Sequence, residues 1–170
     1  MALEALGYVG FGSAALDDWR QFGTGLVGLQ AVERGPSLLS FRMDDRKQRI
    51  VIDRSLPEGA RFFGWEVADA SALEKLAARL EEAEVEVSAE RQTLADARRV
   101  RGLISFRDPA GNRLEAFYGA EIDDTPVSPG RSSLEPTLYQ HQTEASGAVC
   151  SSWMRTFRPL SKRVARIGSL

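Results

Sequence analysis

The 170-residue sequence contains one cysteine, Cys150, and one histidine, His141. A lone cysteine excludes an intramolecular disulfide and a cysteine metal cluster. A lone histidine excludes, within this chain, the common iron and zinc sites that use two or more imidazole ligands. No apolar run approaches the roughly 18–20 residues that a membrane helix needs, and the N-terminus lacks the features of a secretory signal. These absences predict a cytoplasmic protein with no membrane partner.

An excess of charge of one sign is also missing. Lysine and arginine number 22 against 24 aspartate and glutamate, and this balance argues against a nucleic-acid partner. Hydrophobic residues make up 43% of the chain, which is ordinary for a globular protein. The two signs are nevertheless unevenly placed, because six basic residues and only two acidic ones follow Asp124. This asymmetry indicates two segments of different character that meet near residue 125.

The pattern of apolar residues, glycines and turn signals predicts the same order of elements twice. A helix is expected after the first strand of each half, within 14–28 and over 71–84, the second opening on a capping box of Ser71 and Glu74. The stretch 93–100 is expected to be a connecting loop or a helical turn. The predicted strands are 6–12, 29–33, 37–43, 48–54, 62–68, 85–88, 101–106 and 113–119.

The two halves form an internal repeat. A shift of 57 residues places Gly7 and Tyr8 on Gly64 and Trp65. Each half has the order βαβββ, and neither could bury the open face of a four-stranded sheet alone. Two copies together would bury these faces by forming one curved, eight-stranded half-barrel. The predicted fold class is therefore α+β. Its modules span about 1–55 and 61–120 within a domain of residues 1–124, and an irregular tail follows.

Several stretches of the chain resemble one known superfamily. They are LGYVGF with its helical DDWRQF, FFGWEVAD, and the block TLADARRVRGLISFRDPAGNRLEAFYGA with its exit EIDDTPVSPG. They are similar to the vicinal oxygen chelate fold, and more closely to the N-terminal domain of the class I extradiol dioxygenases that cleave 2,3-dihydroxybiphenyl and related catechols. The resemblance covers about residues 1–131. It implies a metal-free structural domain, because in that family two histidines and a glutamate hold Fe(II) in the C-terminal domain.

The resemblance also implies a cup lined by the first and last strands of each module. We place its lining at five positions: Tyr8, Val51, Trp65, Glu115 and Phe117. Only Glu115 can ligate a divalent metal, whereas Fe(II) or Zn(II) needs about three protein ligands. We therefore predict no metal, no cofactor and no catalytic residue in this chain.

Further expectations concern Glu115 and the tail. Glu115 is expected to be a strand carboxylate paired with an arginine such as Arg49 or Arg113. His141 is expected in an exposed loop, and Cys150 is expected to be inert because no base or helix start lies beside it. Residues 125–170 are interpreted as a linker and a disordered or frameshifted tail, with a basic amphipathic surface segment as the alternative.

Three functions stay open at this point. The first is the non-catalytic N-terminal domain of an extradiol dioxygenase of aromatic-compound degradation, truncated before the iron-binding domain and inactive alone. The second is a bleomycin-binding-like protein that holds a small aromatic ligand in the cup. The third is ring cleavage in partnership with a separate catalytic-domain chain. A lone first domain would expose the surface that packs on its partner, so we also expect self-association.

Overall fold

The computed structural model describes residues 3–128, and His141, Cys150 and the predicted tail beyond 128 lie outside the described residues. Within the described residues one sheet contains every strand, in the order β2-β3-β4-β1-β5-β8-β7-β6. Among residues 3–128, no helix has both the length and the apolar character that a membrane crossing would need.

The first module supplies one half of this sheet. Between its first two strands the chain forms α1 (Leu16–Gln21) and continues directly as a π-helix, η1 (Phe22–Leu26). Gly23 lets η1 pack closely on the sheet, because a Cβ there would stand 2.4 Å from the ring of Phe41. The strands are β1 (Ala5–Gly12), β2 (Gln30–Glu33), β3 (Leu38–Arg42) and β4 (Ile50–Asp53).

The second module repeats the order and adds a helix. Asp69, not the predicted capping box, caps the helix over the outer face, since its carboxylate accepts a hydrogen bond from the N–H of Ala72 at 2.7 Å. The stretch expected to be a loop or a helical turn is a seven-residue helix, α3. The elements are β5 (Gly59–Glu66), α2 (Ala70–Glu82), β6 (Ser88–Ala89), α3 (Gln92–Arg98), β7 (Gly102–Arg107) and β8 (Arg113–Tyr118).

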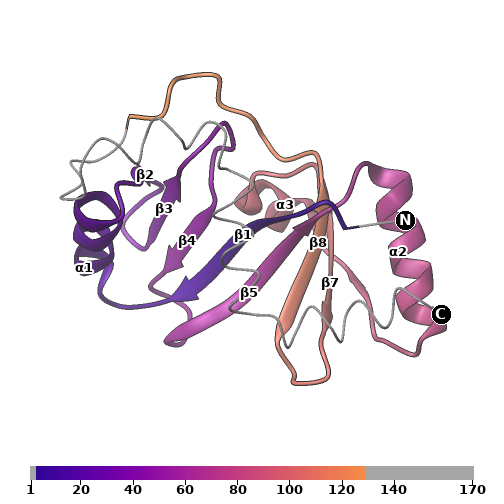
Figure 1. Cartoon of the computed structure of the whole chain (residues 1–170). Coiled ribbons are helices and arrows are strands. Elements are labelled where there is room, and N and C mark those ends of the chain that lie inside the picture. The colour runs from indigo at the N-terminus through magenta and orange to yellow at the C-terminus, as the bar shows by residue number, and fades with distance from the viewer. Residues whose placement is uncertain (1–2, 129–170) are drawn as a thin grey trace. The chain divides into compact units, whose positions relative to one another are not determined.

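The two modules meet at β1 and β5, which pair antiparallel. Each of these strands also pairs in parallel with the last strand of its own module, β4 or β8. The strand order on one side of the β1–β5 junction is thereby repeated on the other. This arrangement confirms the predicted α+β fold of two βαβββ modules in one eight-stranded sheet (Figure 1).

Because neighbouring residues of a strand point to opposite sides, the sheet has two apolar faces. The outer face is covered at its two ends by α1 and α2, which bury Leu16 and Leu73 respectively (Figure 1). The other face, which we call the cup, contains Val51 and Phe62 packed against Ala95 of α3. The cup is therefore covered by α3.

The chain after β8 crosses back to the first module. Arg42 of β3 is 1% exposed and donates hydrogen bonds to the carbonyl oxygens of Asp123 and Thr125, at 3.2 and 2.8 Å. It also pairs with the Asp123 carboxylate at 2.8 Å. Further along, the N–H of Ser128 donates to the side chain of Gln30 on β2. These bonds fix the exit segment, residues 121–128, on the first module.

Candidate functional site

The structure brings together four of the five residues predicted to line the cup. Tyr8, Val51 and Phe117 belong to one buried cluster, in which the rings of Tyr8 and Phe117 stack with centroids 4.9 Å apart. The hydroxyl of Tyr8 donates a hydrogen bond to the carboxylate of Glu115 at 2.7 Å. These side chains come from β1, β4 and β8, the strands that the sequence assigned to the cup.

The fifth residue, Trp65, is not among them. Its neighbour Gly64 lies under the Tyr8 ring, so alternation along β5 places Trp65 on the outer face. Phe62 takes the position expected for Trp65, because its ring lies over Gly10 as the Tyr8 ring lies over Gly64. The prediction was wrong because β1 and β5 correspond by a shift of 54 residues, Tyr8 onto Phe62, rather than 57.

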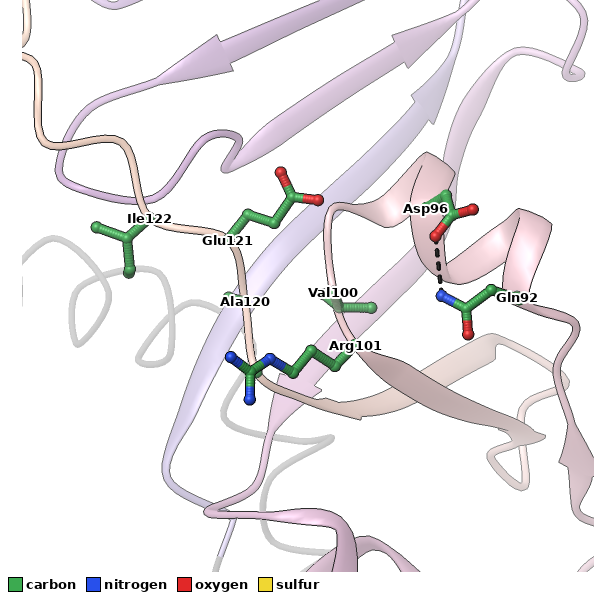
Figure 2. A pocket seen from close by; sticks show the side chains of 8 residues that line it. Gln92, Asp96, Val100, Arg101, Ala120, Glu121 and Ile122 are labelled. Carbon is green, nitrogen blue, oxygen red and sulfur yellow. Dashed lines mark hydrogen bonds between the residues drawn. The ribbon is translucent and has the colours of Figure 1, made fainter.

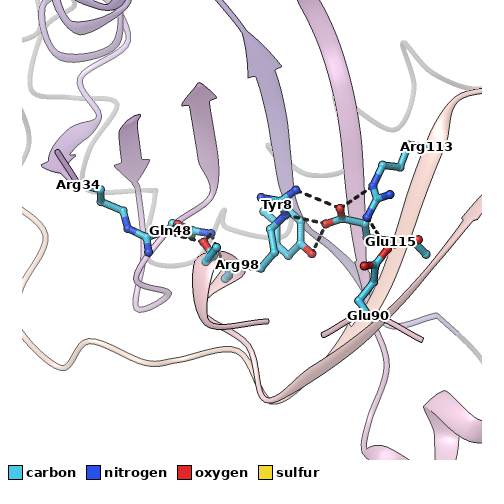
Figure 3. Close-up of polar contacts among 9 residues, drawn as sticks. Tyr8, Arg34, Gln48, Glu90, Arg98, Arg113 and Glu115 are labelled. Atoms are coloured by element: carbon cyan, nitrogen blue, oxygen red, sulfur yellow. Dashed lines mark hydrogen bonds and ion pairs between the residues drawn. The ribbon is translucent and has the colours of Figure 1, made fainter. Parts of the chain in front are cut away.

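Glu115 is completely buried, and both of its carboxylate oxygens accept hydrogen bonds. Arg98 donates through Nε at 2.8 Å and through Nη2 at 3.1 Å. Arg113 donates through Nε at 3.0 Å, and Tyr8 donates its hydroxyl hydrogen (Figure 3). Paired charges and saturated hydrogen bonds are what allow a carboxylate to remain ionised in a protein interior.

The expectation of an arginine partner is confirmed by Arg113, and the alternative, Arg49, has another partner. Arg49 instead pairs with Asp44 at 2.6 Å, in the segment between β3 and β4. Sequence reasoning missed Arg98, because the stretch that carries it was not assigned to a helix facing the cup. One signal in the sequence could have pointed to it. A buried carboxylate at Glu115 needs more positive charge nearby than the partly exposed Arg113 supplies.

Two pKa shifts describe the charge state of the site. Burial acts to raise the pKa of Glu115, but the hydrogen bond and charge of Arg98, with hydrogen bonds from Tyr8 and Arg113, hold it below its ordinary value. Burial and then the charge of Glu115 raise the pKa of Tyr8 well above its ordinary value. At neutral pH the site therefore holds one carboxylate, two guanidinium groups and a neutral phenol.

Helix α3 carries Arg98 to the carboxylate and is held at its C-terminal end by the first module. Arg34 donates to the carbonyl oxygen of Ala97 at 2.7 Å, and Gln48 donates to that of Arg98 at 2.9 Å (Figure 3). These bonds satisfy carbonyl groups that a helix end leaves without partners. The guanidinium of Arg98 also lies over the ring of Phe62, 3.6 Å from its centroid.

The cup does not fit a divalent metal. Its one carboxylate, Glu115, already carries two guanidinium groups, which occupy its lone pairs and repel a further cation. The Tyr8 phenol holds its proton too firmly to serve as an anionic ligand. No group of three or more histidine, cysteine, aspartate or glutamate side chains in residues 3–128 could hold a metal ion. The donor set is therefore unsuited to Fe(II).

A separate cleft of about 500 Å³ lies between α3 and the chain that leaves β8 (Figure 2). None of the five predicted lining residues borders it. Its two carboxylates already have partners, since Asp96 accepts a hydrogen bond from Gln92 at 2.8 Å and Glu121 pairs with Lys47 at 2.9 Å. The cleft offers no nucleophile with an adjacent base.

Comparison with known proteins identifies this arrangement. Residues 6–54 match the family model described as Dihydroxybiphenyl dioxygenase BphC D1. Over 131 residues the chain is 38% identical to the biphenyl-2,3-diol 1,2-dioxygenase of Paraburkholderia xenovorans strain LB400, an alignment that covers 76% of this chain and 44% of the relative. This region resembles the N-terminal domain of the extradiol dioxygenases. The 3-methylcatechol 2,3-dioxygenase of Pseudomonas putida is 36% identical over 129 residues, covering 75% and 44% of the two chains.

Solved structures of extradiol dioxygenases agree with this assignment. A crystal structure of catechol 2,3-dioxygenase superposes with a TM-score of 0.75 and 34% identity, over 79% of this chain and 48% of that one. The Mn(II)-bound glyoxalase of Novosphingobium aromaticivorans shares the fold, with a TM-score of 0.57, 19% identity and coverage of 72% and 42%. The resemblance seen in the sequence motifs is confirmed. The chain spans less than half the length of the extradiol dioxygenases it matches.

Proposed function

We propose that this chain provides the first, non-catalytic domain of a cytoplasmic extradiol dioxygenase, and that Fe(II)-dependent ring cleavage requires a second, iron-binding domain. The observation that carries the proposal is the state of Glu115, whose bonds to Arg98, Arg113 and Tyr8 leave no place for a metal. The names of the relatives support an aromatic ring with two adjacent hydroxyl groups as the substrate class of the whole enzyme.

The proposed role of the domain is structural. The sheet is closed on both faces, by α1 and α2 outside and by α3 in the cup. Arg42 fixes the exit segment on the first module, so the chain leaves the domain at a defined place. A rigid body with a fixed exit is suited to supporting a following domain, not to reacting with a substrate.

Iron content and catechol cleavage by the purified full chain test the proposal. After anaerobic incubation with Fe(II) and desalting, we expect far less than one iron per chain and no ring-cleavage product from biphenyl-2,3-diol or 3-methylcatechol. The Paraburkholderia xenovorans enzyme, treated in parallel, is the positive control. Stoichiometric iron with turnover by the chain alone would contradict the proposal.

The same preparation tests the two other functions. Product that forms only when a separately expressed iron-binding domain of a relative is added would establish the split-enzyme alternative. The aromatic-ligand alternative needs an open cup, but the rings of Tyr8, Phe62 and Phe117 already pack together under α3. We therefore expect no heat of binding when biphenyl-2,3-diol is titrated into the chain without iron.

The partners expected from the sequence remain predictions. They are a second copy of the chain or a catalytic-domain chain. Exposed apolar side chains on and beside η1 support association with one of these partners. Phe22, Leu26 and Val27 are 49%, 48% and 40% exposed. Sedimentation of the purified chain at several concentrations measures whether it associates with a second copy of itself.

A further inference from the structure

The contacts of Arg98 are those of a ligand in a binding site. Its guanidinium forms a two-pronged hydrogen bond to the carboxylate of Glu115, and its flat face lies over the ring of Phe62. A carboxylate fork and an aromatic face are the two features by which proteins recognise a guanidinium group. We propose that the cup is a guanidinium-binding site that the chain fills with its own Arg98.

The receptor side of this site is preorganised on the sheet. Glu115, Phe62 and Tyr8 lie on β8, β5 and β1, three adjacent strands. The Tyr8 hydroxyl and the Arg113 guanidinium fix the carboxylate, and Glu90 in turn holds Arg113 at 2.7 Å. Side chains fixed in this way keep their positions when a ligand leaves.

The ligand side, in contrast, depends on few bonds. Helix α3 has seven residues, and a helix of this length does not form by itself in water. It is held by Arg98, by Ala95 and Leu94, which pack into the cup, and by the hydrogen bonds of Arg34 and Gln48 at its last carbonyl groups. Helix α3 is thus a tethered arm that presents a guanidinium group to the sheet.

The site selects its occupant by shape and charge. A divalent metal would face one carboxylate and the remaining Arg113 cation, so the site rejects it. An alkylammonium ion has the right charge, but it lacks the planar fork that matches Glu115 and the flat face that matches Phe62. The ligand class is a small, planar monocation of the alkylguanidinium type.

The test is thermal unfolding of the full-length Arg98→Ala variant with added ethylguanidinium chloride. Removal of Arg98 empties the site, so 10 mM ethylguanidinium should raise the melting temperature by about 3–6 °C if it binds with a dissociation constant of about 1 mM. The same concentration of ethylammonium chloride should have no such effect. The melting temperature of the unmodified chain should not rise with either salt, because its site is filled.

Two variants serve as controls. Arg107→Ala removes an exposed guanidinium that donates to the carbonyl oxygen of Gly111, and ethylguanidinium should not stabilise it. The double variant Arg98→Ala with Glu115→Gln removes the fork, and it should lose the response. Equal responses of Arg98→Ala and Arg107→Ala, or equal effects of the two cations, would overturn the proposal.

Should Arg98→Ala fail to fold alone, the measurement becomes refolding yield. Arg98→Met, which keeps an unbranched apolar side chain beside Phe62, is the second variant. Ethylguanidinium should restore folding of at least one of the two variants, and ethylammonium of neither. Failure of ethylguanidinium to restore either one contradicts the proposal. The proposal does not rest on the dioxygenase assignment, since iron content and ring cleavage do not enter the measurement.

Discussion

The two modules share one plan of strands but contribute opposite chemistry to the cup. Val51 of β4 lies beside Gly10, and Glu115 of β8 lies beside Gly64, in equivalent places of the two modules. The first module thus contributes an isopropyl group where the second contributes a carboxylate. A metal site between the modules needs donors from both of them. The repeated fold therefore does not by itself repeat a functional site.

The outer faces differ as well. In the second module the 13-residue α2 buries Leu73 and Leu80 against the sheet. In the first module α1 has six residues, and η1, which continues it, leaves Phe22 and Leu26 half exposed. The second module is the better covered of the two, and the first keeps apolar surface in contact with solvent.

The largest expected effect comes from truncation at the two equivalent cup positions. Glu115→Ala should lower the free energy of unfolding by about 3–5 kcal/mol, because it leaves the guanidinium of Arg98, whose side chain is only 13% exposed, without its counter-charge. Val51→Ala should cost about 1–2 kcal/mol, as the loss of two buried methyl groups does. Urea denaturation measures both values, and equal costs would remove the distinction between the modules.

An intermediate and symmetrical effect is expected at the two glycines of the cup. A Cβ at Gly64 would stand 2.3 Å from the Tyr8 ring, and one at Gly10 would stand 1.9 Å from the Phe62 ring. Gly64→Ala and Gly10→Ala should therefore each cost about 1–3 kcal/mol through overpacking. Gly25→Ala, where nothing lies within 4 Å, is the control for the general cost of the substitution. A large cost in one module alone would show that the equivalence fails.

A smaller effect should appear in the dependence of stability on pH. The pKa of Glu115 is lower in the folded chain than its unfolded value of about 4.3, so its stabilising contribution is complete above that pH. The contribution is lost as the pH falls through the lowered pKa, because the unfolded chain then binds the proton more readily. Urea unfolding between pH 6 and pH 3 should show the advantage of the unmodified chain over Glu115→Gln shrinking with acid. A difference in free energy of unfolding that stays constant over this pH range would contradict a lowered pKa of Glu115.

The smallest effect on stability is expected at the exposed end of the first module. Phe22→Ser should lower the free energy of unfolding by about 1 kcal/mol, because only half of the residue is buried. It should nevertheless weaken self-association in sedimentation experiments. Glu81→Ser, on the exposed side of α2, is the matched surface control. If both variants associate equally, the exposed apolar side chains of the first module do not mediate self-association.

Much of the fold follows from local sequence signals. The repeated order of strands and helices predicts the sheet. Seven of the eight predicted strands have a matching strand in the structure, whereas the one expected at 85–88 is only the two-residue β6, which shares Ser88 with it. The cap of α2 was predicted wrongly, because Ser71 with Glu74 matches the capping-box pattern although Asp69 is also a good cap residue. Asp69 is the cap, and its carboxylate reaches the N–H of Ala72. Such choices depend on the path of the chain into the helix, which residue types do not specify.

The cup was predictable in part. Alternation places Tyr8 and Phe117 on one face, but the position of Trp65 depended on how the two modules were aligned. Two contacts between the modules set that alignment: the Tyr8 ring lies over Gly64, and the Phe62 ring lies over Gly10. Arg98 was missed for a related reason. Helix α3 is too short to form without its tertiary contacts, so the sequence shows no helical periodicity of apolar residues there.

The anchoring of residues 121–128 by Arg42 has a mechanical consequence. A pull on the chain at Ser128 reaches β2 through Gln30 and β3 through Arg42 before any load arrives at β8. The charged and hydrogen-bonded contacts of Arg42 must shear together, because one guanidinium makes them all. In a force spectrometer with the handle attached after residue 128, these contacts with the first module would break before the last strand is peeled away, although that strand lies closer to the handle in the sequence.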